Sequence, residues 1–452
     1  MSRCVGIAVG GESVKAVVAG TDRAASPCDQ MSVPAVLALA PGLGVLVGAQ
    51  AERLAASGPG SVFRDFTGRV GDPVPVVASD GSARLGADLV AMTIGGVLRG
   101  CAASSDLAHL TIAHPTGWGP YEASVLRSAL TCTDAEGAPT SLVSRPVAAV
   151  TAAVAAGMMS FSETVIVAEI GGDGTELALV TGADNQAGRI EATSRTDDLS
   201  STGLDRALAR HVLEQVRSHL PAPDLHDRAN RAIIHAVVAA CRVGREELIR
   251  HTSTVVDVRL PAHNVPVRIV RAEFESLARE PIHVLLSSID HLMGQSRKNG
   301  IEVDAIVLTG KLARTPLVTE LLSAQWTTRV VIPPFPEWAA ASGAAHIAER
   351  RRQPRVIAPL SAARSNVVQL PPRQSRFDGP SVPSRRPQAP SAPSQAMPAV
   401  PDVQPTRSER KWTLRWGAIQ LTAALLSNSQ PQATGHWDYG PSRRHRAVPR
   451  HI

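Results

Sequence analysis

Two segments of the chain carry apolar runs on both sides of a glycine-rich turn. Residues 4–20 read CVGIAVGGESVKAVVAG, and residues 164–182 read TVIVAEIGGDGTELALVTG. Runs rich in Val and Ile are typical of buried strands, and glycines permit the positive φ angles that tight hairpins need. We predict two strand–turn–strand hairpins. Their recurrence, roughly 160 residues apart, predicts two related lobes.

Between and after the hairpins, the apolar pattern predicts helices and further strands, and so an α/β fold. Leu204, Leu208, Val212 and Val216 repeat every four residues, which indicates a helix with one buried stripe. Pro146 suits the first turn of a helix. Helices are predicted at residues 87–98, 121–130, 144–157, 204–216, from 315 onward and at 339–352. Strands are predicted at residues 109–115, 254–270 (two, joined by a loop) and 304–310.

The composition changes near residue 353. From there to about residue 410, Pro, Ser, Arg and Gln dominate and the apolar periodicity ends. Such a segment cannot bury enough apolar area to offset chain entropy, so we expect residues 353–452 to form a disordered, Pro-rich tail. Residues 351–452 hold 16 Lys and Arg against 4 Asp and Glu, a net charge of +12 within a total of +6. This basic charge either solvates the tail or attracts a protein partner or an acidic surface.

Several classes of protein are disfavoured. The five cysteines are scattered without a CxxC pair, which argues against a disulfide framework or zinc site and favours a reducing, cytoplasmic environment. The first apolar run is interrupted by Glu12 and Lys15, unlike a signal peptide. The longest apolar runs fall short of the ~20 residues of a membrane span. No transmembrane segment, metal-ligand spacing or specific nucleic-acid partner is predicted.

Five motifs, in order along the chain, resemble the ATPase domain of the 70-kDa heat-shock (DnaK-type) chaperones, within the actin-like ATPase superfamily. They are similar to that family's first phosphate loop, first connecting helix, second phosphate loop, adenosine loop and second connecting helix. Any one glycine turn is weak evidence, whereas five motifs in order over roughly residues 1–350 are specific. The motifs are GIAVGGE (6–12), SRPVAAVTAAVAAG (144–157), EIGGDGTELAL (169–179), IVLTGKLARTP (306–316) and PEWAAASGAA (336–345).

The resemblance implies an actin-like ATPase fold with two lobes around a nucleotide cleft. Lobe I is expected at 1–160, lobe II at 161–335 and a connecting helix that returns toward lobe I at 336–352. The implied ligands are ATP or ADP, with or without Mg²⁺, and Glu169 is the implied catalytic residue. The implied nucleotide-binding residues are Gly10, Gly11, Gly171, Gly172, Gly174, Thr175, Gly203, Arg245, Gly310, Arg314 and Glu337.

The sequence departs from the family where carboxylates are expected. Ala8 replaces the Asp of the first phosphate loop, Arg145 replaces the Glu before the connecting-helix Pro, and the catalytic Lys expected between Phe63 and Arg69 is absent. Hydrolysis in this family needs placed carboxylates, a metal ion and a positioned water. We therefore expect at most a weak ATPase, although the backbone N–H groups of the glycine turns can still hold a phosphate.

Three functions stay open at this point. The first is a nucleotide-binding, chaperone-related protein, although the residues after 352 are too few and too Pro-rich for the family's peptide-binding domain. The second is a pseudo-ATPase scaffold that binds a protein partner through its body and tail, for example in an actinobacterial secretion or membrane assembly. The third is a small-molecule kinase that uses Asp173 or Asp205.

Simpler structural roles also stay open for some of the named residues. Glu169 can serve as a solvated or cross-strand charge, and Thr175 as an ordinary strand residue. Lys311 and Arg314 can flank a helix start, and Glu337 can be a first-turn acid that interacts with a helix macrodipole.

Overall fold

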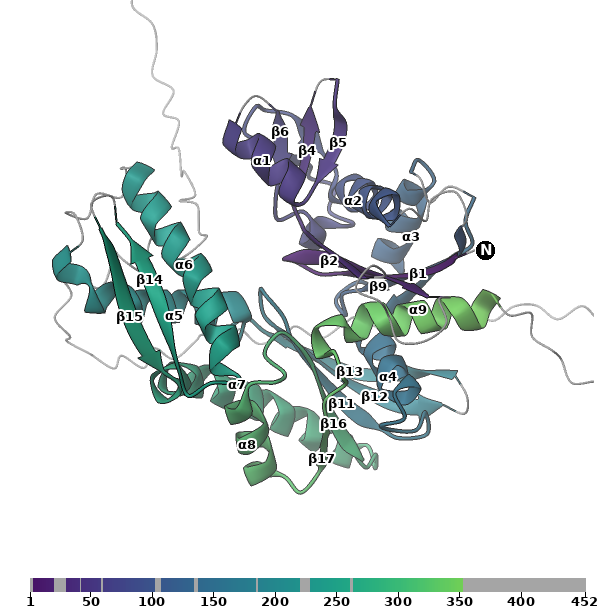
Figure 1. The fold of residues 1–452 in the computed structure, drawn as a ribbon. Coiled ribbons are helices and arrows are strands. Elements are labelled where there is room, and N and C mark those ends of the chain that lie inside the picture. Colours follow the sequence, from purple (N-terminus) through teal and green to yellow (C-terminus); the bar gives the residue numbers. More distant parts are fainter. Residues whose placement is uncertain are drawn as a thin grey trace, which may run out of the picture. The chain divides into compact units, whose positions relative to one another are not determined.

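The computed structural model describes residues 3–19, 30–40, 42–57, 60–101, 107–133, 137–183, 186–219, 228–260 and 263–352. Within them it is a mixed α/β structure that contains two five-stranded sheets (Figure 1), which confirms the predicted fold class. The predicted tail, 353–452, lies outside the described residues.

The first predicted hairpin lies in the middle of one five-stranded sheet. β1 (Arg3–Val9) pairs antiparallel with β2 (Ser13–Ala19) and parallel with β9 (Leu107–His114). β3 (Gln30–Pro34) and β10 (Thr140–Ser144) complete the order β10-β9-β1-β2-β3. The hairpin and the strand that ends before Pro115 are therefore confirmed.

The second hairpin occupies the same position in the other sheet. β11 (Val165–Ile170) pairs antiparallel with β12 (Thr175–Ala183) and parallel with β16 (Ala305–Gly310). β13 (Gln186–Thr196) and β17 (Arg329–Val331) complete the order β13-β12-β11-β16-β17. In both sheets the first hairpin strand pairs in parallel with a much later strand, so the repeated hairpin reflects a repeated strand topology.

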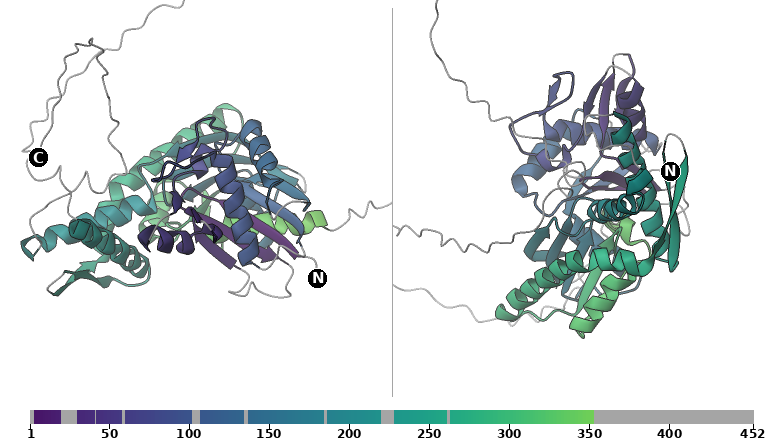
Figure 2. Two further views of the ribbon diagram at one scale, coloured as in Figure 1. Left: turned by 90° about the horizontal axis from the view of Figure 1, so that it is seen from above. Right: turned by 90° about the vertical axis from the view of Figure 1, so that its left-hand side faces the viewer.

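All six predicted helices are present, with ends shifted by a few residues. They are α2 (Gly86–Gly100), α3 (Pro120–Leu130), α4 (Arg145–Ala155), α5 (Ser201–Gln215), α8 (Pro316–Gln325) and α9 (Ala339–Arg352). The predicted strand pair at 254–270 forms β14 (Ser253–Arg259) and β15 (Asn264–Val270). This hairpin lies beside α6 (Arg228–Leu248) in the views of Figures 1 and 2.

Other elements were not singled out by the apolar pattern. The larger ones are α1 (Ala49–Ser57), α6, α7 (Arg271–Lys298) and β13, and β3, β10 and β17 were likewise not predicted. The small strands are β4 (Leu37–Ala40), β5 (Gly44–Val47), β6 (Ser61–Phe63), β7 (Val76–Val77) and β8 (Ala83–Arg84), and the 3₁₀ turns are η2 (Thr67–Arg69), η3 (Arg217–His219) and η4 (Pro336–Trp338). Among the described helices, none has the length and apolar character needed to span a membrane.

Helices α4 and α9 pack against each other, and each also packs on one of the sheets. α9 lies on β1, β2 and β9, while α4 lies on β11, β12 and β13. Small residues allow these close contacts, because a Cβ at Gly6 would overlap the α9 backbone and a Cβ at Gly343 would overlap the carbonyl of Ala148. The crossing fixes Arg145, the first residue of α4, and Glu337, just before α9, against the two glycine turns.

The helix crossing predicts that Gly343→Ala lowers the free energy of unfolding by about 2 kcal/mol or more, because the new methyl meets backbone rather than a movable side chain. Gly294→Ala is the matched control, since Gly294 also lies in a helix but has open space where a Cβ would lie. There the better helix propensity of Ala should leave stability unchanged or raise it by up to about 1 kcal/mol. Urea unfolding measures both, and equal effects would contradict the packing described.

Candidate functional site

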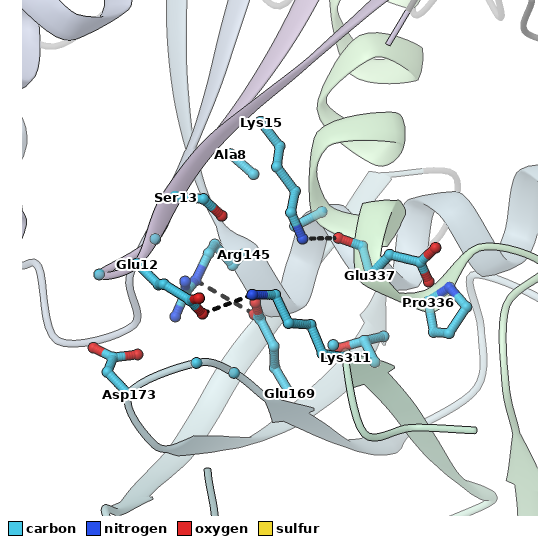
Figure 3. A pocket seen from close by; sticks show the side chains of 17 residues that line it. Ala8, Glu12, Ser13, Lys15, Arg145, Glu169, Asp173, Lys311, Pro336 and Glu337 are labelled. Atoms are coloured by element: carbon cyan, nitrogen blue, oxygen red, sulfur yellow. Dashed lines mark hydrogen bonds and ion pairs between the residues drawn. The ribbon is translucent and has the colours of Figure 1, made fainter. Parts of the chain in front are cut away.

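The two glycine turns face a shared cavity of about 50 Å³. The first turn, residues 10–12, joins β1 to β2, and the second turn, residues 171–174, joins β11 to β12. The N-terminal end of α4, the end of β16 and the segment before α9 complete the walls (Figure 3). The lining residues are Ala8, Gly10, Gly11, Glu12, Ser13, Lys15, Arg145, Glu169, Gly171, Gly172, Asp173, Thr309, Gly310, Lys311, Pro336, Glu337 and Ala340.

Two acids lie directly opposite each other in the second hairpin. The antiparallel register pairs Glu169 on β11 with Glu176 on β12. Alternate strand residues face opposite sides, so both acids share the side on which Val165 and Val167 pack against α4. Like charges at directly opposite positions destabilise a sheet. The hairpin therefore needs a cation beside these two carboxylates.

Arg145, the first residue of α4, supplies that cation. Its Nη2 lies 2.7 Å from Oε1 of Glu176, and its Nε lies 3.3 Å from Oε2 of Glu169. All three side chains are at most 15% exposed. Arg195 on β13 donates from Nη1 to Oε1 of Glu176 at 3.2 Å, and Thr116 donates to its Oε2 from both the hydroxyl and the backbone N–H. One buried and one half-exposed guanidinium thus offset the two acids.

The two acids have different strengths because their partners differ. Burial opposes ionisation of Glu176, but Arg145 and the hydrogen bonds from Thr116 outweigh it and lower the pKa of Glu176 to about 2. Burial raises the pKa of Glu169, and Arg145 offsets this only in part. Burial also disfavours the charged form of Arg145, but Glu169 and Glu176 together raise its pKa. Glu176 is therefore the anion that anchors Arg145.

Glu12, in the first turn, reaches across the cavity to cations of the second half of the chain. Its Oε2 accepts a hydrogen bond from Nζ of Lys311 at 2.7 Å (Figure 3), and its Oε1 accepts one from Nη2 of Arg242 at 2.5 Å. A Cβ on Gly172 would overlap the Glu12 carboxylate, so this carboxylate lies against the second turn. Burial would raise the pKa of Glu12, but Lys311 and Arg242 outweigh it and lower that pKa.

A second lysine and an unsatisfied hydroxyl line the same cavity. Lys15 lies on β2 opposite Ala8, and its Nζ donates to the carbonyl of Glu337 at 2.5 Å. Burial and the nearby Lys311 lower the pKa of Lys15. The hydroxyl of Thr309 is buried and has no hydrogen-bond partner among the described residues. The cavity thus gathers donors that suit an anion.

Arg145 separates this cavity from a larger one of about 510 Å³. Residues that line the larger cavity include Thr116, Trp118, Glu176 and Arg195, while Gly11, Arg145 and Asp173 line both. Glu169 therefore belongs to one cavity and Glu176 to the other, and the guanidinium that joins them forms part of the wall between the two.

The structure brings seven of the twelve predicted site residues together in the smaller cavity. These seven are Gly10, Gly11, Glu169, Gly171, Gly172, Gly310 and Glu337. Gly310 has a φ of +88°, and a Cβ there would overlap the carbonyl of Ile170, so the close approach of β16 to the second turn requires a glycine. Glu337 lines the cavity and is also the first-turn acid of η4.

The other five predicted residues do not line the cavity. Thr175 lies in β12 and donates its hydroxyl to the carbonyl of Leu199 at 2.7 Å. Arg245 is buried, and its Nε donates a hydrogen bond to Oδ1 of Asp205 at 2.6 Å. Asp205, one of the two acids considered for a kinase, is therefore already paired. Gly174 lies in the second turn, and Gly203 lies in the N-terminal turn of α5. Arg314 is exposed, and its guanidinium lies 6.0 Å from the ring centroid of Phe335.

Sequence reasoning missed Glu176, Lys15 and Arg242. Glu176 follows the second turn at the same distance at which Glu169 precedes it, so hairpin register alone could have found it. Lys15 is likewise the cross-strand partner of Ala8. No local signal could have found Arg242, because it meets Glu12 from a helix 230 positions away in the sequence.

Part of the sequence that forms this site matches the model of a known protein family. Residues 140–352 match the Hsp70 protein family model, over just under half of the chain. These residues are therefore similar to an Hsp70-type ATPase domain, from which the chain diverges. The match includes α4 with Arg145, the second turn, Lys311 and α9. Domains of this family generally bind ATP or ADP together with Mg²⁺.

Two curated relatives agree with the Hsp70 family match. The chain is 25% identical over 169 residues to the chaperone protein dnaK3 of Synechococcus elongatus and, to the same extent, to the chaperone protein DnaK 1 of a Synechococcus species. The similar region is 36% of this chain and 22% of each relative. The chain therefore spans about a fifth of the length of the curated relatives it matches.

The donor set does not fit the Mg²⁺ ion of the family. Magnesium prefers carboxylate and water oxygens in near-octahedral geometry. Here Glu169 and Glu176 of the second hairpin lie against Arg145, the half-exposed Asp173 of its turn lies against Arg195, and Ala8 offers no side-chain oxygen. In the described part of the chain, no group of three or more His, Cys, Asp and Glu side chains is placed to hold a metal ion.

The depressed pKa of Glu176 predicts a specific loss of stability in acid. The carboxyl has a pKa near 4.5 when unperturbed and about 2 in the fold. Its stabilising contribution, on the order of 3 kcal/mol at most, is present above pH 4.5 and is lost as the pH falls toward 2. Urea unfolding between these pH values should show a shallower pH dependence for Glu176→Gln. The control, Glu163→Gln, removes an ion pair with the half-exposed Arg329, and a wild-type slope in both variants would contradict the prediction.

Proposed function

We propose that the protein binds the phosphates of ATP or ADP between its two glycine turns and hydrolyses ATP weakly or not at all. One observation carries the proposal: Lys311, Arg242 and the second turn converge on a single negative group, the carboxylate of Glu12. Lys15 and the unpaired Thr309 hydroxyl lie in the same cavity. This arrangement is an anion site that the chain fills with a side chain of its own.

A nucleotide must displace Glu12 in order to bind. The cavity of about 50 Å³ is far below the roughly 300–1,000 Å³ of typical ligand pockets. Glu12 lies in a turn and is 26% exposed, and its partner Lys311 is 25% exposed, so its rotation breaks partly exposed ion pairs. Each such pair is worth about 1 kcal/mol or less. Competition by Glu12 should therefore weaken phosphate binding about tenfold.

Weak or absent turnover is expected from the same residues. Ala8 has no carboxylate, and a general base must lie within hydrogen-bond reach of the proton it takes. Glu169, the proposed catalytic residue, instead lies 3.3 Å from the Arg145 guanidinium. Any residual hydrolysis should depend on Glu169. A chaperone-related role, a cytoplasmic location and a protein partner bound through the residues after 352 are further parts of the proposal.

A nucleotide-independent scaffold is the second candidate. It is favoured by the Glu12 bridge itself, because this contact already joins the first turn to Lys311 and Arg242 without any ligand. In this reading the bridge fixes one arrangement of the two turns, and a partner protein recognises that arrangement.

Calorimetric titration of the full chain with ATP and ADP separates these candidates. Glu12→Gln should bind about tenfold more tightly than the wild type, because the competing charge is gone. Lys311→Met should bind at least tenfold more weakly, because a phosphate loses its cation. Glu163→Gln, whose ion pair with Arg329 involves no residue that lines the cavity, should bind as the wild type does.

The outcomes of this titration decide the function. No binding at millimolar nucleotide, by the wild type or by Glu12→Gln, would rule out the nucleotide site and leave the scaffold. Nucleotide binding by Glu12→Gln but not by the wild type would mean that Glu12 always occupies the anion site in the native protein, which would also favour the scaffold. Release of phosphate at a rate that Glu169→Ala does not change would remove Glu169 from its proposed catalytic role.

A further inference from the structure

We propose that Arg145 takes the place of the divalent cation in this site, so that the protein binds nucleotide phosphates without Mg²⁺. The proposal rests on the proposed nucleotide binding and goes beyond it, because it predicts which conditions the binding needs. It follows from where the guanidinium lies and from which groups it contacts.

The guanidinium lies between the acids of the second hairpin and the backbone at the end of β1. On one side it contacts the opposed acids of the second hairpin, at 2.7 Å from Glu176 and 3.3 Å from Glu169. On the other side its Nη1 lies 3.4 Å from the carbonyl of Val9, and a Cβ built on Gly10 would be 3.3 Å from that Nη1. Arg145 therefore connects the acids of the second hairpin to the backbone of the first turn.

The charge of the guanidinium suits the replacement. Two opposed carboxylates beside a phosphate create a negative site that is unfavourable unless a cation lies among them. Arginine stays protonated in proteins, and its planar array of N–H donors matches the oxygens of phosphate as well as those of carboxylates. Arg145 thus offsets part of the negative charge of the hairpin and presents donors toward the first turn. Lys15 and Lys311 supply further positive charge in the cavity.

The guanidinium also removes the ligands that Mg²⁺ would need. Glu169 or Glu176 could hold a metal ion only if it were released from Arg145, which would leave a charged guanidinium buried beside a second cation. The two cations therefore exclude each other, and Arg145 is held in place by the fold because it begins α4, which packs against α9.

The direct test is calorimetric titration of the wild-type full chain with ADP, once with excess MgCl₂ and once with EDTA. We expect the two dissociation constants to agree within about threefold. A loss of tenfold or more in EDTA would overturn the proposal, even though nucleotide binding itself would then stand. Absence of binding in both buffers would instead refute the proposed function, and the metal question is then decided by a measurement that needs no nucleotide.

That measurement is thermal unfolding with and without MgCl₂. Arg145→Gln frees Glu169 and Glu176, so we expect Mg²⁺ to raise its Tm by several degrees, since a ligand of the folded state stabilises it. Arg195→Gln is the matched control, because it removes the other guanidinium from Glu176 and leaves Arg145 in place. The wild type and the control should show no such rise. A rise of several degrees in the Tm of the wild type would overturn the proposal. This measurement on the wild type still tests the proposal if Arg145→Gln does not fold.

Discussion

The contact of Arg145 with Glu169 and Glu176 is the interaction on which the site depends. The tight turn at residues 171–174 sets the register of the second hairpin, and that register places two acids opposite each other on the side that faces α4. The fold accommodates them with the arginine that begins α4, aided at Glu176 by Arg195 and Thr116. Close packing of small residues between α4 and α9 holds that arginine in position.

Charge compensation by the chain itself extends from this contact to the first turn. Glu12 satisfies Lys311 and Arg242, as Arg145 satisfies the two acids. In the proposed nucleotide site, these side chains occupy the positions that a phosphate and a cation would take. The chain is similar to the Hsp70 family over residues 140–352, while the chemistry of its cavity differs from what that similarity implies, so function must be argued from the site rather than from the fold.

Local patterns predicted the elements well and the contacts between them less well. Alternation and helical periodicity located both glycine hairpins, β9 and the helices that surround them, because each pattern is read within one element. The resemblance located seven residues of the cavity. The register of a tight hairpin could have predicted that Glu176 lies opposite Glu169. The partners of Glu12 could not be predicted in this way, because Arg242 and Lys311 come from distant elements and only the folded chain brings them to the first turn.

The outcome for Arg245 shows the same limit. A resemblance carries a residue type to a position but not the neighbours of that residue, and here Asp205 and Arg245 satisfy each other in the interior. A buried charge is retained only when it is paired. A site residue predicted from a motif can therefore acquire a structural partner that draws it away from the cavity.

A crystal structure of the full chain with ADP and excess MgCl₂ tests the central claim most directly, because it shows which groups hold the phosphates. The account predicts phosphates between the two glycine turns, Glu12 rotated away from Lys311, and Arg145 still between Glu169 and Glu176 with no metal ion beside them. A magnesium ion held by Glu169, with Arg145 displaced from both acids, would contradict it.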